Sequence, residues 1–463
     1  MAQKDQRFKQ LDELFRPRSV AIVGLPQGMK TGKLFLTALQ DMGFAGPIYP
    51  VNPKAAVIDG LTCYPAVSAI SDPVDLAIIL VGQQFAPDVV KKCAAKGVKA
   101  VVLFTAGYKE TGTEAGRRIE AEMVETARAA GMRIFGPNCM GLYVPRTGLS
   151  FFPGLSREPG HLGLISHSGS LANILAGQAE SKGLAFSKAI SLGNEADLQC
   201  ADFLDYFAQD AETRVIGGYI ENIKSGTYFL DALKKAAAVK PVILWKVGLT
   251  PEGSRAASSH TGALAGSEKI WRGVINQCGA IQVAGWEQWV NTMMAFYLLP
   301  HATGKRMAII SGAGGMAVAA AEAAGRQGLK LAEISSTTAN KLAKHLPPSG
   351  TSRANPFDLS LAAHMDPTFF IHAAGLVAAD PHVDAVVVIG SGLDESTNNQ
   401  YVAAMIEARR QSGKVFLIVA IPGMPAETGK AFCRAGLPFF ETAEEAMAAY
   451  ARVTAYYSGT IPP

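Results

Sequence analysis

A single histidine, His260, stands among small residues in the stretch SRAASSHTGALAG at positions 254–266. This stretch follows an apolar run, PVILW at 241–245, and precedes an amphipathic segment from Ser267, which predicts a loop between a strand and a helix. A neutral imidazole is a competent nucleophile near neutral pH, so an exposed histidine on such a loop could carry a phosphoryl group between two sites. A surface histidine in a small-residue turn fits the same spacing.

A glutamate, Glu221, directly follows an apolar segment at 215–220 that is typical of a buried strand. A carboxylate at the C-terminal end of a strand can hydrogen-bond one imidazole nitrogen, fix its tautomer and leave the other nitrogen to attack phosphorus. The next predicted strand leads to the His260 loop, so we expect Glu221 to orient His260. A charge at the start of a helix is the plainer alternative.

Two turns between a predicted strand and a predicted helix could bind anions through free backbone N–H groups. The first follows the strand at 19–24 and includes Gly24, Pro26, Gln27 and Gly28, without the GxGxxG spacing of a dinucleotide site. The second lies in HLGLISHSGSL at 161–171, where Ser168 or Ser170 would cap the helix. Ordinary helix capping would use the same residues.

A lysine, Lys54, follows the predicted strand at 47–52, where a dinucleotide domain usually has an acidic residue for the ribose diol. A cation there favours a phosphorylated ribose such as that of coenzyme A, although an exposed loop lysine is an equal alternative. A third glycine turn, at 312–315, follows the strand at 305–311. Backbone requirements of a tight turn, or docking of a partner, explain this turn without a nucleotide.

The elements that must position these residues alternate between strands and helices along the whole chain. Apolar strands are predicted at 19–24, 47–52, 75–81, 98–104, 132–136, 161–166, 186–191, 215–220, 241–245, 305–311, 384–390 and 415–420. Continuous apolar strands separated by helices predict parallel sheets covered on both faces. We expect an α/β protein with a Rossmann-like domain at 1–146 and flavodoxin-like domains at 147–302 and 303–463, closed by a helix from Thr442 with Glu445 at capping-box spacing.

Composition excludes several classes of protein. The 463 residues are 49% hydrophobic and 18% charged, with a net charge of +4, which indicates a globular protein without a nucleic-acid-binding surface. Neither a bilayer-spanning run nor a signal peptide is present, so a cytoplasmic protein with no membrane partner is expected. The six cysteines form no CxxC pair, which argues against a zinc site or a disulfide framework, and no metal site is predicted.

Seven segments together resemble the α subunits of NDP-forming acyl-CoA synthetases, the ADP-forming acetate–CoA ligase relatives of succinyl-CoA synthetase. They cover nearly the whole chain and are YPVNPK at 49–54, TAGYKE at 105–110, GPNCMG at 136–141, LGNEAD at 192–197, YIE at 219–221, KPVILWKVG with SRAASSHTGALAG at 240–266, and NPFDL at 355–359. The resemblance implies a Rossmann-like CoA-binding domain followed by two domains like those of succinyl-CoA synthetase.

The resemblance also implies a role for each site residue. His260 would be phosphorylated, and Glu221 would hold it. The phosphoryl group would be bound by Ser168, Gly169, Ser170, Thr261 and Gly262, and coenzyme A by Gly24, Pro26, Gln27, Gly28, Lys54, Phe104, Thr105, Ala106 and Asn138. Two positions depart from the family: His167 stands where glutamine or arginine is commoner, and Asn222 replaces a glycine.

The implied activity is that of an acid–CoA ligase of the EC 6.2.1 class. A carboxylic acid, ATP and CoA would give acyl-CoA, ADP and phosphate through an acyl phosphate and a phosphohistidine. No residues remain for an ATP-grasp module, so ATP and Mg²⁺ are expected on a β subunit in an α2β2 hetero-oligomer. The alternatives are a CoA-binding regulatory or scaffold protein without phosphoryl transfer and an NAD-dependent dehydrogenase, against which Lys54 argues.

Overall fold

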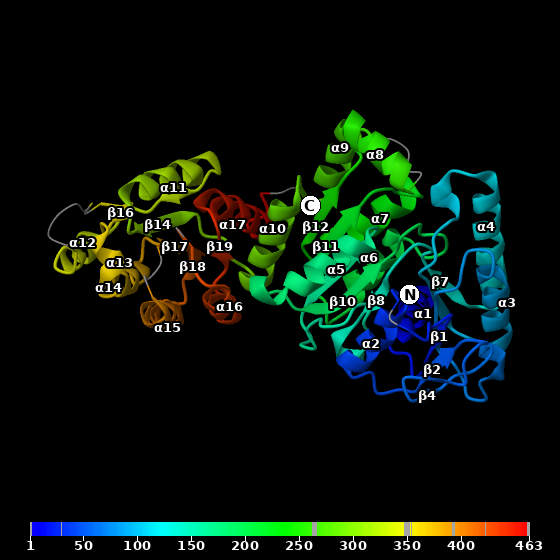
Figure 1. Cartoon of the computed structure of the whole chain (residues 1–463). Helices are drawn as coiled ribbons and strands as arrows, with labels where there is room; N and C mark the ends of the chain where they lie inside the picture. Colours follow the sequence, from blue (N-terminus) through cyan, green and yellow to red (C-terminus); the bar gives the residue numbers. More distant parts are fainter. Residues whose placement is uncertain are drawn as a thin grey trace. The chain divides into compact units, whose positions relative to one another are not determined.

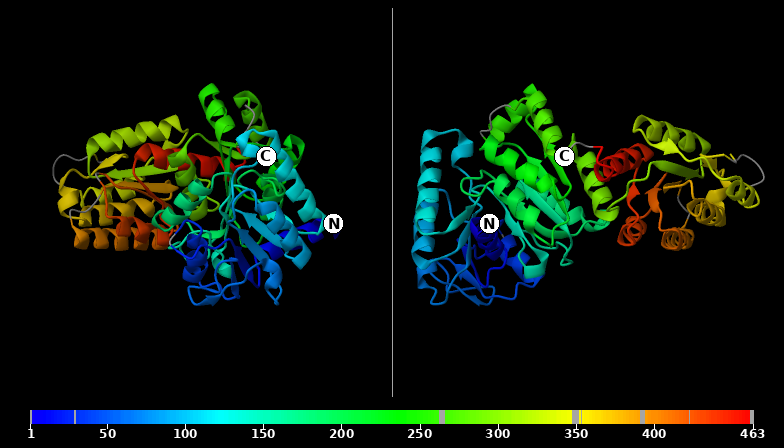
Figure 2. Two further views of the ribbon diagram at one scale, coloured as in Figure 1. Left: turned by 45° about the vertical axis from the view of Figure 1, so that its right-hand side comes forward. Right: turned by 180° about the vertical axis from the view of Figure 1, so that it is seen from behind.

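The computed structural model describes residues 2–28, 30–261, 266–346, 352, 354–390, 394–421 and 423–460, without the side chains of 2–5 and 258–261. Within this part of the chain there are three parallel sheets flanked by helices (Figures 1 and 2). The chain divides into two compact units, of which the first holds two sheets in residues 1–178 and 185–284. The second unit holds the third sheet in residues 179–184 and 285–462.

The first sheet has the strand order β2-β1-β5-β6-β7, and all its neighbours are parallel. Every residue of its three central strands is buried, which explains their unbroken apolar sequences. The strands are β1 (Val20–Val23), β2 (Ile48–Val51), β5 (Leu76–Ile79), β6 (Ala100–Leu103) and β7 (Arg133–Phe135). Helices α2 (Lys33–Met42), α3 (Ala86–Lys96) and α4 (Glu114–Ala129) connect them, and a hairpin of β3 (Val57–Ile58) and β4 (Leu61–Thr62) follows β2.

The second sheet has the order β13-β12-β11-β9-β10-β8, in which only the edge strand β8 is antiparallel. Its strands are β8 (Gly141–Tyr143), β9 (Leu162–Ser166), β10 (Phe186–Ser191), β11 (Val215–Ile220), β12 (Val242–Lys246) and β13 (Ile281–Val283). Its helices are α5 (Gly169–Gln178), α6 (Cys200–Gln209), α7 (Gly226–Ala237), α8 (Pro251–Thr261) and α9 (Glu268–Cys278), and α1 (Ala2–Leu14) packs on α6 through stacked Phe8 and Tyr206.

The third sheet has the order β15-β14-β17-β18-β19, and β16 pairs with β14. Its strands are β14 (Arg306–Ser311), β15 (Lys330–Leu331), β16 (Phe357–Asp358), β17 (Ala385–Ile389), β18 (Val415–Val419) and β19 (Phe439–Phe440). The longer helices of this unit are α10 (Trp286–Leu298), α11 (Gly314–Arg326), α14 (Thr368–Ala378), α15 (Glu395–Ser412), α16 (Ala426–Arg434) and α17 (Ala443–Tyr457). The predicted cap of α17 is present, because Thr442 Oγ1 accepts a hydrogen bond from the Glu445 N–H at 3.2 Å.

The predicted fold class is confirmed, and each of the three sheets repeats the flavodoxin-like strand order 2-1-3-4-5 in its parallel strands. Two segments cross the predicted boundaries. Strand β8 precedes residue 146 but joins the second sheet, and α10 precedes residue 302 but packs against α17 within the second unit. The predicted domain boundaries at 146/147 and 302/303 therefore remain predictions.

The third glycine turn needs no phosphate to explain it. A Cβ on Gly314, at the start of α11, would overlap the carboxylate of Asp358, so the chain's own acidic side chain lies at this helix end. Oδ1 of Asp358 also accepts a hydrogen bond from the Ser360 N–H at 2.8 Å. Because a carboxylate already faces the positive end of the helix dipole, a bound phosphate would meet like charge.

One buried carboxylate, that of Asp197, connects the first two sheets. It accepts hydrogen bonds from Arg128 Nε at 2.8 Å, Arg133 Nε at 2.8 Å and the Ile134 N–H at 3.1 Å. Burial alone would raise the pKa of Asp197, but the hydrogen bonds and charge of Arg133, together with Arg128, hold this pKa below its usual value. A lowered folded-state pKa stabilises the fold above the unfolded-state pKa, and this stability is lost as the pH falls through the folded-state pKa.

The variant Asp197→Asn is therefore expected to lower the free energy of unfolding at pH 7 by roughly 3 kcal/mol, the lower end of the range for a broken buried pair, because both arginines reach solvent. The deficit should begin to shrink below about pH 4, where this carboxylate takes up a proton in the unfolded chain, and should disappear as the folded carboxylate is protonated at lower pH. Urea unfolding at pH 7 and at pH 3.5 measures both effects. The exposed pair Arg326–Glu322 provides the control, since Glu322→Gln should change stability by less than about 0.5 kcal/mol. A pH-independent deficit for Asp197→Asn would contradict this account.

Candidate active site

The C-terminal ends of β1, β5, β6 and β7 lie at one edge of the first sheet, where ligands bind in open α/β sheets. The chain leaves β1 through Gly24, whose φ is +88° and where a Cβ would lie 2.8 Å from Val81 Cγ1. Only glycine allows this close approach of the two turns. After β6 the backbone is tied back to β5, because Thr105 Oγ1 donates to the Val81 carbonyl at 2.6 Å.

The turn after β9 supplies the start of a helix to the same region. Ser168 Oγ accepts a hydrogen bond from the Leu171 N–H at 3.3 Å, so Ser168 rather than Ser170 caps α5. A Cβ on Gly169 would lie 2.5 Å from Met140 Cγ, which means that glycine lets the first turn of α5 approach the segment after β7. The N–H groups of this turn and the helix dipole favour an anion here.

These elements enclose a cavity of about 460 Å³ within the first unit. It is lined by His167 and by seven of the residues predicted to bind CoA or phosphate. These seven are Phe104, Thr105, Ala106, Asn138, Ser168, Gly169 and Ser170. The lining residues that were not among the predicted site residues are Leu80, Val81, Gly82, Cys139, Met140 and Gly193, of which the last three lie in segments that carry the resemblance. Leu80 to Gly82 directly follow a recognisable strand, so the edge rule for parallel sheets could have found them.

The other predicted CoA-binding residues form a neighbouring group at the ends of β1 and β2, outside the lining of this cavity. Gln27 Nε2 donates to the Lys54 carbonyl at 3.4 Å. Asn52 joins the two loops, because its Nδ2 donates to the Leu25 carbonyl at 2.9 Å and its Oδ1 accepts from the Lys54 N–H at 2.9 Å. Lys54 is exposed, as are Gln27 and Gly28. The structure thus brings Gly24, Pro26, Gln27, Gly28 and Lys54 together as a second cluster.

His167 is buried at the boundary of the cavity, with Nδ1 hydrogen-bonded and Nε2 beside the Glu195 carboxylate. Nδ1 accepts hydrogen bonds from the N–H groups of Glu221 at 3.1 Å and Asn222 at 3.3 Å. The proton is therefore on Nε2, which lies 3.1 Å from Oε1 of Glu195. This ring joins the turn after β9 to the end of β11, so His167 is a positioning residue that the sequence did not identify as such.

Glu195 brings a third group to this cluster. It is 1% exposed and has a positive φ of 52°. Its carboxylate accepts a hydrogen bond from the Cys200 N–H, and burial together with the Glu195 charge raises the pKa of the Cys200 thiol. Ligand atoms of His167, Glu195 and Cys200 lie within 4.8 Å of one another, a spacing that a metal could use. Because Nδ1 of His167 accepts two backbone hydrogen bonds, the ring hydrogen is on Nε2, at the position a metal would need, so a contact between Nε2 and Glu195 describes the cluster better than a metal site.

Glu221 is 5% exposed at the end of β11, as the sequence predicts for a residue directly after a buried strand. Burial raises the pKa of Tyr219, and the nearby Glu221 carboxylate raises it further. Lys246 Nζ donates to the Glu221 carbonyl at 3.0 Å, and burial lowers the pKa of Lys246. The Glu221 carboxylate is therefore buried beside a tyrosine hydroxyl at the end of β11, where an orienting group could lie.

The segment that contains His260 differs from the predicted loop, because residues 251–261 form helix α8. Pro251 suits the first helical position, the alanines that follow favour a helix, and Thr250 Oγ1 accepts from the Gly253 N–H at 3.0 Å as a cap. Helix α8 contacts the short turn Lys109–Thr111 after β6. The side chains of His260 and Thr261, and Gly262 as a whole, lie outside the described residues, so their predicted roles stay predictions.

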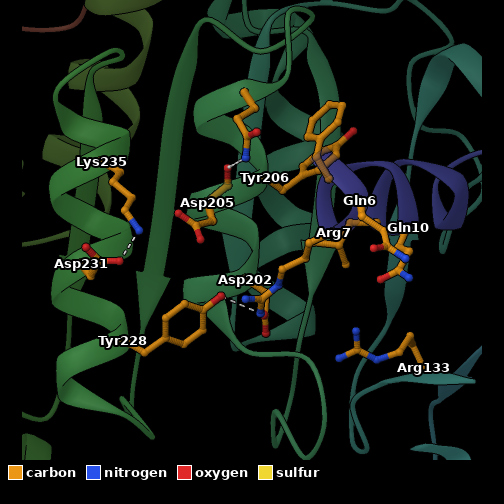
Figure 3. Close-up of a pocket in the computed structure, with 13 residues that line it drawn as sticks. Gln6, Arg7, Gln10, Arg133, Asp202, Asp205, Tyr206, Tyr228, Asp231 and Lys235 are labelled. Atoms are coloured by element: carbon orange, nitrogen blue, oxygen red, sulfur yellow. Dashed lines mark hydrogen bonds and ion pairs between the residues drawn. The ribbon is translucent and has the colours of Figure 1, made fainter. Parts of the chain in front are cut away.

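A larger cavity of about 640 Å³ lies among α1, α6 and α7, and Figure 3 shows the charged and aromatic side chains that line it. Arg7 pairs with Asp202, which also accepts a hydrogen bond from the Tyr228 hydroxyl at 3.0 Å. Lys235 pairs with Asp231 in the same way. None of the predicted site residues lines this cavity.

Comparison with known proteins places the two sheets of the first unit in described families. Residues 18–145 match the CoA binding domain, and residues 159–296 match the succinyl-CoA ligase like flavodoxin domain. The α subunit of acetate–CoA ligase (ADP-forming) II from Pyrococcus furiosus is 36% identical over 454 residues, which cover 96% of this chain and 97% of that protein. The α subunit of the corresponding ligase I from the same organism is 36% identical over 420 residues, covering 89% and 90% of the two chains.

A solved structure agrees with these matches. A dinucleotide-forming acetyl-coenzyme A synthetase 1 from Candidatus Korarchaeum cryptofilum, in complex with phosphate and ADP, has a TM-score of 0.84 and 31% identity, covering 96% of each chain. The likeness therefore extends over all three sheets. Within the described part of the chain, the longest apolar stretches of helix fall short of what a bilayer crossing requires.

Proposed function

The chain belongs to the α subunits of the ADP-forming acetate–CoA ligases, and from this membership we propose how its residues share the reaction. The ligase forms acyl-CoA from a carboxylic acid and CoA at the expense of ATP. We propose that an acyl phosphate and a phosphohistidine on His260 are the intermediates. In this scheme His260 carries the phosphoryl group between the acid and the nucleotide, and Glu221 holds the imidazole.

One observation carries the proposal: the strand ends of the CoA-binding domain and the first turn of α5 enclose the same cavity of about 460 Å³. A thiol held by the strand ends and a phosphoryl group held at the helix start would be adjacent there. Phe104, Thr105, Ala106 and Asn138 would bind the thiol end of CoA, and Ser168, Gly169 and Ser170 the phosphoryl group. Positioning and charge stabilisation would then do most of the work of phosphoryl transfer.

The cluster at the ends of β1 and β2 is proposed to bind the nucleotide end of CoA. Gly24, Pro26, Gln27 and Gly28 present a turn, and the exposed Lys54 supplies a cation for the 3′-phosphate. His167 takes no part as a phosphoryl carrier in this scheme, because Nδ1 accepts backbone hydrogen bonds and Nε2 faces Glu195. A nucleophilic nitrogen needs a free lone pair, which His167 does not offer, so His260 is kept as the proposed carrier.

The nucleotide is proposed to bind to an ATP-grasp β subunit, together with Mg²⁺, in a cytoplasmic α2β2 complex. The six free cysteines are all buried, as is common in a reducing compartment. The test is to purify the chain alone and together with a candidate ATP-grasp polypeptide, and to measure acyl-CoA and ADP. Only the complex should form both products, and synthesis by the homogeneous chain alone would contradict the proposal.

The variant Gly169→Ala is expected to weaken CoA binding by about tenfold, because the added methyl group would displace Met140 and open the contact between α5 and the segment after β7. Calorimetry with CoA measures the effect. Gly177→Ala on the same helix is the matched control, since a Cβ there meets nothing within 4 Å. The control should keep full affinity and gain up to about 1 kcal/mol of stability. Equal affinities of the two variants would remove Gly169 from the site.

The variant Lys54→Ala is expected to abolish the preference for CoA over dephospho-CoA. A charge-assisted contact of an exposed lysine with a phosphate is worth about 1 kcal/mol, so the wild-type preference should be roughly fivefold. Competition binding with the two ligands measures it, and raising the salt concentration should reduce it. Lys30→Ala, at an exposed lysine in the neighbouring turn, is the control. A full preference in Lys54→Ala would contradict the assignment.

A further inference from the structure

A small cavity of about 240 Å³ lies within the second unit, among α10, the end of α11 and α17. Helices α10 and α17 pack side by side (Figure 1). None of the residues assigned above to CoA, phosphate or catalysis lines it. Its polar lining includes a guanidinium, two buried oxygen atoms, a pair of glutamates and the amides of Gln288 and Gln327.

The guanidinium belongs to Arg452, near the C-terminal end of α17. No hydrogen bond or ion pair joins this group to another residue in the described part of the chain, and the side chain is only partly exposed. Burial lowers the pKa of Arg452. Arginines in such surroundings are normally paired with a carboxylate or phosphate. An anion in the cavity would supply that missing partner.

The two oxygen atoms belong to neighbouring residues of α10. Asn291 is 3% exposed and Thr292 is fully buried, and both line the cavity. Among the described residues, neither Oδ1 of Asn291 nor Oγ1 of Thr292 has a hydrogen-bond partner. A buried polar atom without a partner costs about 1–3 kcal/mol, so such atoms usually face water or a ligand. Because Oδ1 can only accept, its partner must bring a hydrogen-bond donor.

The space itself is created by α17. Ala448 and Ala449 lie one turn before Arg452, and their small side chains leave room along the helix. Glu444 and Glu445 line the other end of the cavity, two turns before Arg452. Burial and the nearby Glu287 raise the pKa of Glu445. Acidic side chains at one end would repel a ligand with a second negative charge.

We propose that this cavity binds a small carboxylate that also carries a hydroxyl or amino group. The carboxylate would pair with Arg452, the donor group would satisfy Oδ1 of Asn291, and Oγ1 of Thr292 would bond to either. At about 30 Å³ for each non-hydrogen atom, the volume suits a molecule of up to about eight such atoms. The site lies on a unit to which the reaction above assigns no ligand, so the inference stands independently of that scheme.

The test uses the full chain with CoA present throughout, so that the first cavity is filled, and three probes with a three-carbon skeleton. Lactate and alanine carry the donor group, and propionate lacks it. Calorimetry should show one lactate or alanine site per chain, with propionate at least tenfold weaker. Inorganic phosphate should not compete. Tighter binding of phosphate or propionate than of both donor-bearing probes would overturn the assigned ligand class.

Two variants locate the site. Arg452→Gln removes the charge, and Ala448→Leu fills the cavity while keeping the charge, so each should weaken the preferred probe at least tenfold. Arg326→Gln, at an exposed arginine of α11 that already pairs with Glu322, should leave binding unchanged. If Arg452→Gln fails to fold, Ala448→Leu decides. Absence of binding by the wild type, or unchanged binding in the folded variants, would overturn the proposal.

Discussion

Replacing His260 by alanine is expected to abolish acyl-CoA synthesis by the complete enzyme while leaving CoA binding intact. The imidazole would carry the phosphoryl group itself, so no neighbouring side chain could substitute for it, and the loss should be at least about 10⁴-fold. CoA affinity should stay within about twofold, because the described lining of the CoA cavity includes no residue of α8. Steady-state rates and calorimetry measure the two quantities on the same preparation.

The matched control is Ser259→Ala, one residue away in the same helix. It should keep most of the activity, which would separate a chemical role of the imidazole from a disturbance of α8. Substantial turnover by His260→Ala would move the chemistry to another residue. Loss of CoA affinity in His260→Ala would instead show that α8 and the cavity of about 460 Å³ depend on each other.

Replacing Glu221 by glutamine is expected to slow phosphorylation of the histidine by roughly 10²–10⁴-fold without abolishing it. Glutamine keeps the size of the side chain, and the backbone N–H of residue 221 would still donate to His167. The imidazole would keep its nucleophilic nitrogen but lose the carboxylate that fixes its tautomer and stabilises the charged ring. Rapid-mixing experiments with labelled ATP measure this rate.

The variant Tyr219→Phe is the control for this effect, since the Tyr219 hydroxyl lies close enough to the Glu221 carboxylate for this charge to help raise the pKa of Tyr219. Loss of the hydroxyl would leave the carboxylate charged and only less firmly directed, so the rate should fall less than about tenfold. If Glu221→Gln phosphorylates the histidine at the wild-type rate, Glu221 has a purely structural role at the end of β11.

The fold could be predicted closely because its strands are continuous apolar segments bounded by turns. Strand β10 was predicted at 186–191 and lies at Phe186–Ser191, and β11 was predicted at 215–220 and lies at Val215–Ile220. Shorter strands were missed. Strand β8 has three residues and pairs antiparallel at an edge, and β16 has two, so neither gives a periodic signal.

The resemblance assigned Phe104 and Asn138 to the CoA site, and this assignment stays a prediction. Phe104 directly follows β6, and Asn138 lies three residues after the end of β7, at the edge of the sheet where parallel strands end. His167 could not be interpreted from the sequence. Its role depends on N–H groups at residues 221 and 222 and on a carboxylate at residue 195, which only the folded chain brings together. The helix at 251–261 was missed because its small residues, read as a flexible loop, include the alanines that favour a helix.

The most direct test of the phosphohistidine scheme is to give the complex γ-labelled ATP and locate the label. A phosphoramidate is labile in acid and stable in base, so the account predicts one base-stable label in the peptide that contains His260, absent from His260→Ala. A label on Ser258 or Ser259 would instead survive mild acid. Acyl-CoA formation without a base-stable label, or a base-stable label that persists in His260→Ala, would contradict the account.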